Sequence, residues 1–558
     1  MQTAASQAGD DPGLARNGQS IWCSVRLPVA RVRARAKGLF PPSGTDRHVG
    51  LFALTIVLHI GIWWIVALVL YAPADIHNDM AEAFAWGRDL QWGYYKHPPF
   101  WALITKLWFL IFPTADWAFY LLAVVNSAVG LVGVWAIAGR YVSGTRRLAA
   151  VLLLELVPFN NVLAFTFNAN SMQSSLWPWT LYVFIVSFES RRSTAAVGFG
   201  LLAAAAIMSK YFGGVLLVSC LIAAVTSPRV GEYFRSAAPY VTIAVFGACV
   251  APHIIWLTRV SNGPLDYLAT KTAYPFPFVL EKAATFVAGI FLLHSFLEIV
   301  LLLFWLRRGK PGWELAPIQP AVLVTRPRVR LVLVLAVAPF LVAVLVSLVG
   351  NVRLSTKFAL PLCSLIPLIW IIFHGARLSR PAMFAVVMSV GLFMASSLIL
   401  AIPTAILKFK SDHRHFADPR AIVARQVTDL WHAYAGKPLR IVSGTEGYAL
   451  AATFYSADHP SDFIDLSRSK APWIDDARLG REGLAIICSS YDRECLDNMK
   501  RLEPLDSTRV NLTDISKTFL WYHGERSSFV VLLVRPGQAV DSRALTDGCK
   551  SPAGIGAQ

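Results

Sequence analysis

Charged residues are scarce in this chain of 558 residues: Asp, Glu, Lys and Arg make up only 15% of it, whereas 55% is hydrophobic. The hydrophobic residues occur in long runs rather than in alternation with polar ones, and the mean hydropathy is +0.52. This composition excludes an ordinary soluble protein. It predicts a polytopic membrane protein built mainly of α-helices.

Motifs that bind nucleotides or structural metals are missing as well. The chain has no P-loop, no GxGxxG and no internal repeat, so no motif supports an ATP or nucleotide-sugar site. Its seven cysteines show neither CxxC nor metal-ligand spacing. Only Cys488 and Cys495 are candidates for a disulfide, which would require that their domain be external.

The basic residues outnumber the acidic ones, and the net charge is +17. Lys and Arg lie in short loops between apolar runs, as they do in the cytoplasmic loops of membrane proteins. We therefore expect membrane lipids, and no nucleic acid, among the partners of this protein.

The apolar runs predict about eleven membrane spans, with the N-terminus in the cytoplasm and the C-terminus outside. The expected spans are 49–71, 116–139, 147–165, 171–188, 195–209, 211–226, 238–258, 284–306, 329–350, 357–374 and 381–403. When the loops between these spans alternate between the two sides, every basic cluster lies on the cytoplasmic side. The run at 98–112 is too short to cross, and we expect an interfacial helix there.

Composition divides the chain into four parts. We expect a disordered cytoplasmic leader at 1–48, a transmembrane module at 49–408 with its first external loop at 72–115, an external α/β domain at 409–540, and a flexible tail at 541–558. Within the α/β domain, apolar stretches at 439–442, 484–488 and 529–534 alternate with helical patterns at 420–434, 448–455 and 492–502.

The first external loop concentrates acids, cations and aromatic residues next to the first span. Its order D-x6-W-x-R-x-L-x-W-G-Y-x-x-H-P-P, from Asp79 to Pro99, resembles the first loop of the family 39/83 lipid-linked glycosyltransferases. This GT-C group includes protein O-mannosyltransferases, ArnT and rhizobial galacturonosyltransferases. The resemblance places the catalytic aspartate at Asp79. The family's Asp-Glu pair reads Asp79-Met80 here, which leaves Asp75 or Glu82 to supply the second acid.

The resemblance implies a glycosyltransferase of the bacterial inner membrane with its site and its C-terminal domain in the periplasm. It would move a hexosyl, pentosyl or uronosyl group from a polyprenyl-phosphate donor to a glycolipid such as lipid A or its core, to another lipid, or to a protein. Asp79 would act as the general base of an inverting transfer. The alternative is a transporter or flippase of similar architecture that carries a lipid-linked sugar without reacting it.

Other polar residues share the outer side in this topology, and several at one membrane depth indicate a polar cavity. The candidates for binding the donor phosphate are His97, Lys210, Arg353 and Lys357. The candidates for binding acceptor or sugar are Glu82, Tyr95, Lys96, Asn168, Asn170 and Tyr211.

Some of these assignments have open alternatives. Lys210 lies at a helix end, where a lysine side chain often only extends its charge to the membrane surface (snorkelling). Arg353 and Lys357 could instead be charges that only set the topology. Relatives usually carry an Asp in the segment that holds Asn168 and Asn170. His97 beside carboxylates leaves a divalent metal ion open as a cofactor, and nothing indicates another one.

Overall fold

The computed structural model describes residues 46–538 except 261–262, 271, 273, 308–309, 311–325, 374–377, 413–414, 503 and 505–506. The expected tail and nearly all of the expected leader lie outside these residues. Up to residue 411 the α-helices are α2 (Asp46–Leu70), α3 (Asn78–Arg88), α4 (Phe100–Phe109), α5 (Asp116–Ala138), α6 (Gly144–Leu152), α7 (Gln173–Ser190), α8 (Ser193–Ser209), α9 (Gly213–Val225), α10 (Val230–Phe234), α11 (Ala238–Leu257), α12 (Pro264–Thr270), α13 (Phe276–Leu293), α14 (Ser295–Leu306), α16 (Pro327–Val349), α17 (Ile366–Phe373) and α18 (Arg380–Ser411).

Among the described residues, six of these helices are long and apolar enough to cross a membrane. They are α2, α5, α11, α13, α16 and α18, and α4, α8, α9 and α14 are shorter apolar helices. The chain is therefore mainly helical with several candidate spans, as the sequence predicts, while the number eleven stays a prediction. The expected helix within 98–112 is present as α4, and its interfacial position also stays a prediction.

Three of the expected spans are not continuous helices. In 147–165, α6 gives way to the 3-10 turns η1 (Leu153–Leu156), η2 (Pro158–Asn160) and η3 (Val162–Ala164), because Pro158 has no N–H to donate. In 284–306 the helix breaks at His294, whose Nδ1 bonds the carbonyl of Ile290 at 2.7 Å. In 357–374 the 3-10 turn η4 (Thr356–Ala359) precedes the short α17.

A buried charged group explains part of this irregular segment. Glu155 in η1 is fully buried, and its carboxylate lies 2.9 Å from His59 Nδ1 and accepts a hydrogen bond of 3.0 Å from Trp63 Nε1. Both partners come from α2. A charge inside a helix bundle is stable only when it is paired or hydrogen-bonded, and Glu155 meets this condition.

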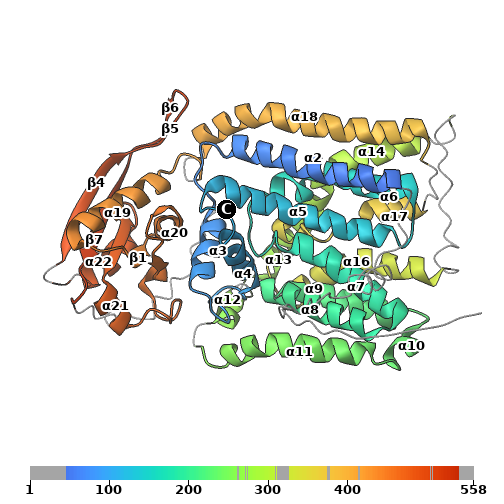
Figure 1. The fold of residues 1–558 in the computed structure, drawn as a ribbon, viewed down its shortest axis with the longest axis horizontal. Coiled ribbons are helices and arrows are strands. Elements are labelled where there is room, and N and C mark those ends of the chain that lie inside the picture. The colour runs from blue at the N-terminus through green and yellow to red at the C-terminus, as the bar shows by residue number, and fades with distance from the viewer. Residues whose placement is uncertain are drawn as a thin grey trace, which may run out of the picture. The chain divides into compact units, whose positions relative to one another are not determined.

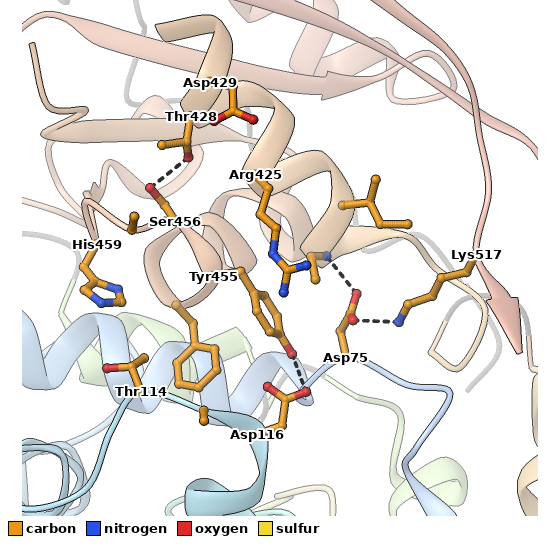
Figure 2. A pocket seen from close by; sticks show the side chains of 15 residues that line it. Asp75, Thr114, Asp116, Arg425, Thr428, Asp429, Tyr455, Ser456, His459 and Lys517 are labelled. Atoms are coloured by element: carbon orange, nitrogen blue, oxygen red, sulfur yellow. Dashed lines mark hydrogen bonds and ion pairs between the residues drawn. The ribbon is translucent and has the colours of Figure 1, made fainter. Parts of the chain in front are cut away.

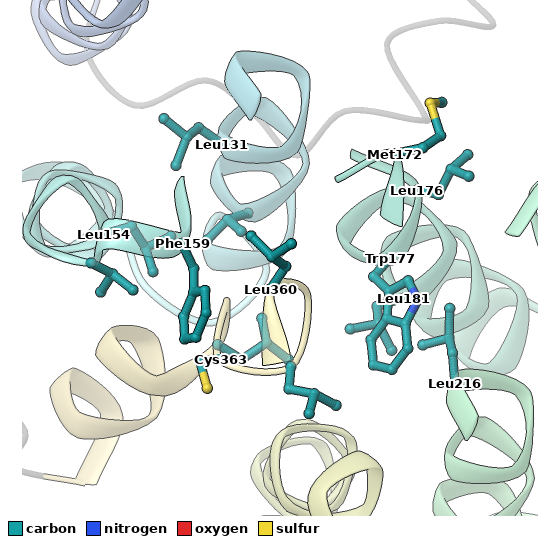
Figure 3. Packing of buried hydrophobic residues seen from close by; sticks show 14 of the residues in the cluster. Leu131, Leu154, Phe159, Met172, Leu176, Trp177, Leu181, Leu216, Leu360 and Cys363 are labelled. Atoms are coloured by element: carbon teal, nitrogen blue, oxygen red, sulfur yellow. The ribbon is translucent and has the colours of Figure 1, made fainter. Parts of the chain in front are cut away.

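The helices pack through apolar side chains and a few close backbone contacts. α5 packs against α2 and α7, and α8 packs against α7 and α11. A Cβ at Gly130 of α5 would lie 2.3 Å from the backbone oxygen of Ser174, so only glycine allows this approach. Figure 3 shows Phe159 beside Leu154 and Cys363 in the same apolar core.

The C-terminal part contains a five-stranded sheet with the order β2-β1-β3-β7-β4 (Figure 1). Its strands are β1 (Ile441–Gly444), β2 (Ser461–Asp462), β3 (Leu484–Ser489), β4 (Thr508–Ile515) and β7 (Ser527–Val534), and its helices are α19 (Arg420–Ala435), α20 (Glu446–Tyr455), α21 (Asp476–Glu482) and α22 (Arg493–Leu502), with the 3-10 turn η5 (Ile464–Leu466). β1 pairs in parallel with β2 and β3, whereas β7 runs antiparallel to β3 and β4. The expected α/β pattern is confirmed.

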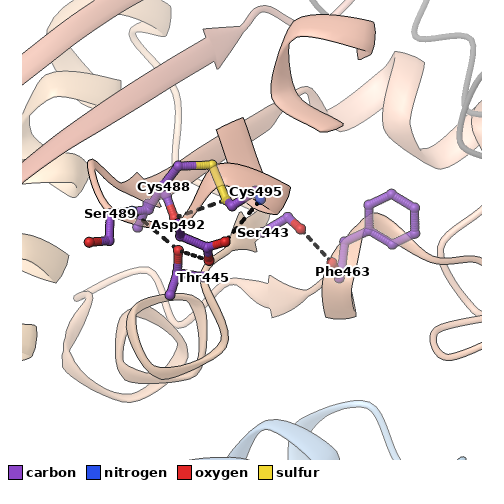
Figure 4. The surroundings of a disulfide bond; sticks show 8 residues. Ser443, Thr445, Phe463, Cys488, Ser489, Asp492 and Cys495 are labelled. Carbon is purple, nitrogen blue, oxygen red and sulfur yellow. Dashed lines mark hydrogen bonds between the residues drawn. A yellow bond between two sulfur atoms is a disulfide. The ribbon is translucent and has the colours of Figure 1, made fainter. Parts of the chain in front are cut away.

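The sequence did not predict β4 or the small hairpin of β5 (Thr518–Phe519) and β6 (Tyr522–His523). β4 is mostly exposed and polar, so no apolar run marks it. The predicted disulfide between Cys488 and Cys495 is present and joins the end of β3 to the first turn of α22 (Figure 4). Beside it, Asp492 accepts hydrogen bonds from the Thr445 hydroxyl and from the Cys495 N–H.

Candidate functional site

Aromatic side chains hold the first external loop in shape. The rings of Trp86 on α3 and Tyr94 stack at 4.2 Å, and Trp101 on α4 meets Trp86 edge-on at 5.4 Å. The Tyr94 hydroxyl donates a 2.6 Å hydrogen bond to the carbonyl of Trp86 and accepts one from Gln91 N. These aromatic positions of the motif thus build a core that returns the chain over α3, and the first turn of this helix carries Asp79.

Asp79 lies at the N-terminus of α3, where His77 Nδ1 accepts a hydrogen bond from its backbone N–H. Its carboxylate accepts a 2.8 Å hydrogen bond from Asn168 Nδ2, and its side chain remains 39% exposed. A carboxylate that is partly exposed can still reach a substrate hydroxyl, so the geometry suits a base.

Two asparagines connect this carboxylate to a cation. Asn168 Oδ1 accepts the backbone N–H groups of Asn170 and Ser171 at 2.9 Å each, which fixes the turn before α7. Asn170 Oδ1 accepts a hydrogen bond from Lys210 Nζ, and this ammonium also lies 4.1 Å from the centre of the Phe358 ring. Residues far apart in the sequence therefore place an acid and a cation in one hydrogen-bonded array.

The charges of this array affect one another. Burial raises the pKa of Asp79, but the charge of His77, the hydrogen bond of Asn168 and the charges of Lys357 and Lys96 outweigh burial and hold this pKa below its usual value. Burial lowers the pKa of Lys210 to about 7, against the attraction of Asp79. A bound phosphate would favour the charged form of Lys210.

A second group of charges lies between the first loop and α20. Lys96 Nζ donates to Glu82 at 2.9 Å and to Glu446 at 3.2 Å, and it lies 5.0 Å from the centre of the Tyr95 ring. Burial lowers the pKa of Lys96, but the charge of Glu82 outweighs it and raises this pKa. Glu82 is thus engaged in an ion pair, while burial raises its own pKa to about 7.

Tyr211 follows Lys210 and belongs to a chain that reaches the first loop. The Nδ1 of His253 on α11 lies 2.6 Å from the carbonyl of Trp92, so Nδ1 carries the proton. His253 Nε2 then accepts the hydrogen bond of 2.8 Å from the Tyr211 hydroxyl. His253 was not foreseen from the sequence, because one histidine within an apolar helix has no signal of its own.

The other candidate phosphate ligands, Lys357, His97 and Arg353, differ in how they interact with Asp79 and Lys210. The charge of Lys357, an exposed residue of η4, acts on both Asp79 and Lys210. Burial and the charge of Lys210 lower the pKa of His97 to about 3, so its imidazole is neutral. The Arg353 guanidinium lies 5.8 Å from the centre of the Phe278 ring, and among the described contacts none joins it to Asp79 or Lys210.

The C-terminal domain binds the loop just before Asp79, which sequence analysis did not foresee. The buried Asp75 accepts hydrogen bonds from Lys517 Nζ at 2.6 Å and from the backbone N–H of Ala421 at 2.8 Å. Arg420 donates to the side chain of Asn78, and the Ile76 N–H donates to the Tyr455 hydroxyl. Asp75 therefore fixes the domain, and it is no more available than Glu82 as a second acid.

A cavity of about 710 Å³ adjoins these contacts, between the start of α5 and the C-terminal domain (Figure 2). Asp75, Asp116, Arg425, Asp429 and Lys517 supply its charged walls. None of the predicted acceptor residues lines it. In the part of the chain that the structure describes, no three His, Cys, Asp or Glu side chains gather as metal ligands, so the geometry adds no support for a metal ion.

The sequence model of the dolichyl-phosphate-mannose-protein mannosyltransferase family matches residues 96–256. No curated protein matches the chain in sequence. The structure of ArnT from Cupriavidus metallidurans bound to undecaprenyl phosphate is similar to this chain with a TM-score of 0.54 and 13% identity. The match covers 87% of this chain and 97% of ArnT, and the apo ArnT structure has a TM-score of 0.55 over the same shares, also at 13% identity.

The oligosaccharyltransferase of Archaeoglobus fulgidus is less similar, with a TM-score of 0.38 and 12% identity. That match covers 77% of this chain and 68% of the oligosaccharyltransferase. The ArnT match therefore carries the likeness of fold.

Replacement of Asp75 tests the attachment of the C-terminal domain. We expect Asp75→Ala to destabilise the protein by about 1–3 kcal/mol, because it removes the carboxylate partner of the half-buried Lys517 ammonium and the acceptor of the Ala421 N–H. The melting temperature of the purified protein in detergent should fall clearly. Asp429→Ala is the matched control, since this exposed aspartate lies in the same cavity and should melt like the parent. Equal melting of all three proteins would contradict a supporting role for Asp75.

Proposed function

We propose that this chain is a membrane glycosyltransferase of the GT-C superfamily and that it transfers a sugar from a polyprenyl-phosphate donor to an acceptor hydroxyl, with Asp79 as the base. The observation that carries the proposal is the hydrogen-bonded array that joins Asp79 through Asn168 and Asn170 to Lys210. A transfer of this kind requires a base for the incoming hydroxyl and a cation for the departing phosphate, and the array holds both.

In this mechanism the acceptor oxygen attacks the anomeric carbon while the bond from this carbon to the phosphate oxygen breaks. Asp79 receives the proton of the hydroxyl, and its low pKa keeps it ionised and ready to do so. Lys210 stabilises the negative charge that grows on the leaving polyprenyl phosphate, with Lys357 nearby. Inversion at the anomeric carbon follows from a single displacement.

Two further observations support the donor and the side of the membrane. The ArnT structure of similar fold holds undecaprenyl phosphate, a lipid of the proposed donor class. The disulfide between Cys488 and Cys495 is typical of an oxidising compartment, which supports a periplasmic C-terminal domain and site in the bacterial inner membrane. The acceptor is a glycolipid, another lipid or a protein.

Removal of the base tests the core of the proposal. We expect Asp79→Asn to reduce kcat by roughly 100-fold or more, since the amide keeps the shape but accepts no proton. Sugar transfer by purified protein in proteoliposomes measures this. Asp89→Asn, at the other end of α3, should retain a rate close to that of the parent. Parental turnover by Asp79→Asn would favour the transporter that carries a lipid-linked sugar without reacting it.

The phosphate contact is tested by Lys210→Met, which keeps an unbranched stem but removes the charge. One charge-assisted contact contributes about 1.5–3 kcal/mol, so the KM for the lipid donor should rise about 10- to 100-fold. Lys106→Met removes an exposed lysine of α4 and should leave this KM unchanged. A parental KM in Lys210→Met would return Lys210 to the snorkelling interpretation.

The pH profile tests whether Asn168 keeps Asp79 ionised. Because the pKa of Asp79 is lowered, kcat/KM of the parent should not fall on account of this group until the pH drops below the usual titration range of an aspartate. Asn168→Asp places a second carboxylate beside it, which raises the pKa and moves the acid limb to higher pH. Asn168→Ala removes only the hydrogen bond and should move the limb less. If the acid limb of the profile stays at the same pH in Asn168→Asp, Asp79 is not the group that causes it.

A further inference from the structure

The hairpin of β5 and β6 carries an apolar tip that faces solvent. At its turn Leu520 is 53% and Trp521 is 70% exposed. Among the described residues beyond α18, the only other large hydrophobic side chain exposed to this degree is Tyr491. An adjacent, exposed Leu-Trp pair at the turn of a short hairpin suits contact with an apolar partner.

The hairpin is attached to the end of a membrane helix. The rings of Phe519 and Phe409 lie 5.9 Å apart, and Lys410 Nζ lies 3.8 Å from the centre of the Tyr522 ring. Figure 1 shows β5 and β6 beside the C-terminal end of α18. In its last turns this helix exposes the apolar side chains of Leu398, Ile399, Leu400, Ile402 and Leu407, shortly before Phe409. The tip thus continues a surface suited to face lipid.

Ring contacts place the end of α18 at the level where other spans end. Phe416, just after α18, stacks on Tyr71 at 5.5 Å, and Tyr71 follows the last residue of α2. Tyr71 also stacks at 5.2 Å on Tyr120, in the first turns of α5. The ends of three helices therefore meet in one aromatic layer, and tyrosine and tryptophan favour the boundary between hydrocarbon and headgroups.

We propose that the hairpin tip is a membrane anchor. Leu520 and Trp521 insert into the headgroup region of the outer leaflet, while Lys408 and Lys410 in the last turn of α18 bind the phosphates of anionic phospholipids. The indole has an apolar body and one N–H, so the wet boundary satisfies both of them better than water does.

The anchor has a direct connection to the first external loop. Lys517, the residue before β5, donates to the carbonyl of Pro73 at 3.0 Å and to Asp75 at 2.6 Å. Contact of the tip with lipid thereby helps to hold the C-terminal domain over the segment that precedes Asp79. The inference does not depend on the reaction that the site performs.

Labels at the tip test the anchor in the full-length protein. In a background with Cys23, Cys249 and Cys549 replaced by Ser, an environment-sensitive fluorophore is attached at Trp521→Cys and the protein is placed in vesicles of phosphatidylglycerol and phosphatidylcholine. We expect a blue-shifted emission and quenching of about two-fold by lipids with a nitroxide near the headgroup. Iodide in the water should quench little.

The control is the same label at Tyr491→Cys, an exposed aromatic position at the turn between β3 and α22. It should respond to iodide and not to the lipid nitroxide. Phosphatidylglycerol should increase the lipid quenching at position 521 in the parent. The double variant Lys408→Gln with Lys410→Gln should show no such increase. The proposal is overturned if label 521 behaves like label 491, or if it is shielded from iodide without lipid quenching, which would indicate a protein partner.

Discussion

A carboxylate at the end of a membrane helix bundle is stable only where donors and cations surround it, and Asp79 meets this condition through residues from distant parts of the chain. Asn168 binds it directly, His77 caps the same turn, and Lys357 and Lys96 act on it by charge. These groups hold Asp79 ionised without closing it off from solvent. The candidate site is built around that balance, because a buried carboxylate without partners would be neutral and a fully solvated one would have no fixed position.

The C-terminal domain belongs to the same construction. Its contacts with the first loop run through Asp75, Asn78 and Lys96, on both sides of Asp79 in the sequence. Lys517 and Arg420 bring positive charge to a loop rich in acids, so the two parts attract each other where the chemistry is proposed. The position of Asp79 therefore depends on a domain that begins more than 300 residues later in the chain.

Much of the fold could be predicted from the sequence, for reasons that are local. Long apolar runs specify membrane helices because backbone N–H and C=O groups in lipid must bond one another, and a helix satisfies them within one segment. The strand and helix pattern after residue 412 followed from hydrophobic periodicity, and β1, β3 and β7 lie where it placed them. Prediction failed at 147–165, where Pro158 and the pairing of Glu155 with α2 override an apolar run. It also failed at β4, where Val510 and Leu512 stand among polar residues and form no apolar run.

For the site, the sequence by itself determined the residues of the first loop, through motif spacing that marks Asp79 and through aromatics that pack into a core. It also supplied Lys210, Asn168 and Asn170 as polar residues at helix ends. Only the tertiary structure decided that these groups form one hydrogen-bonded array, and that Asp75 and Glu82 are engaged by Lys517 and Lys96 instead. The physical reason is that partners of a buried charge come from distant parts of the chain, and their distances are set by packing between helices rather than by spacing along the sequence.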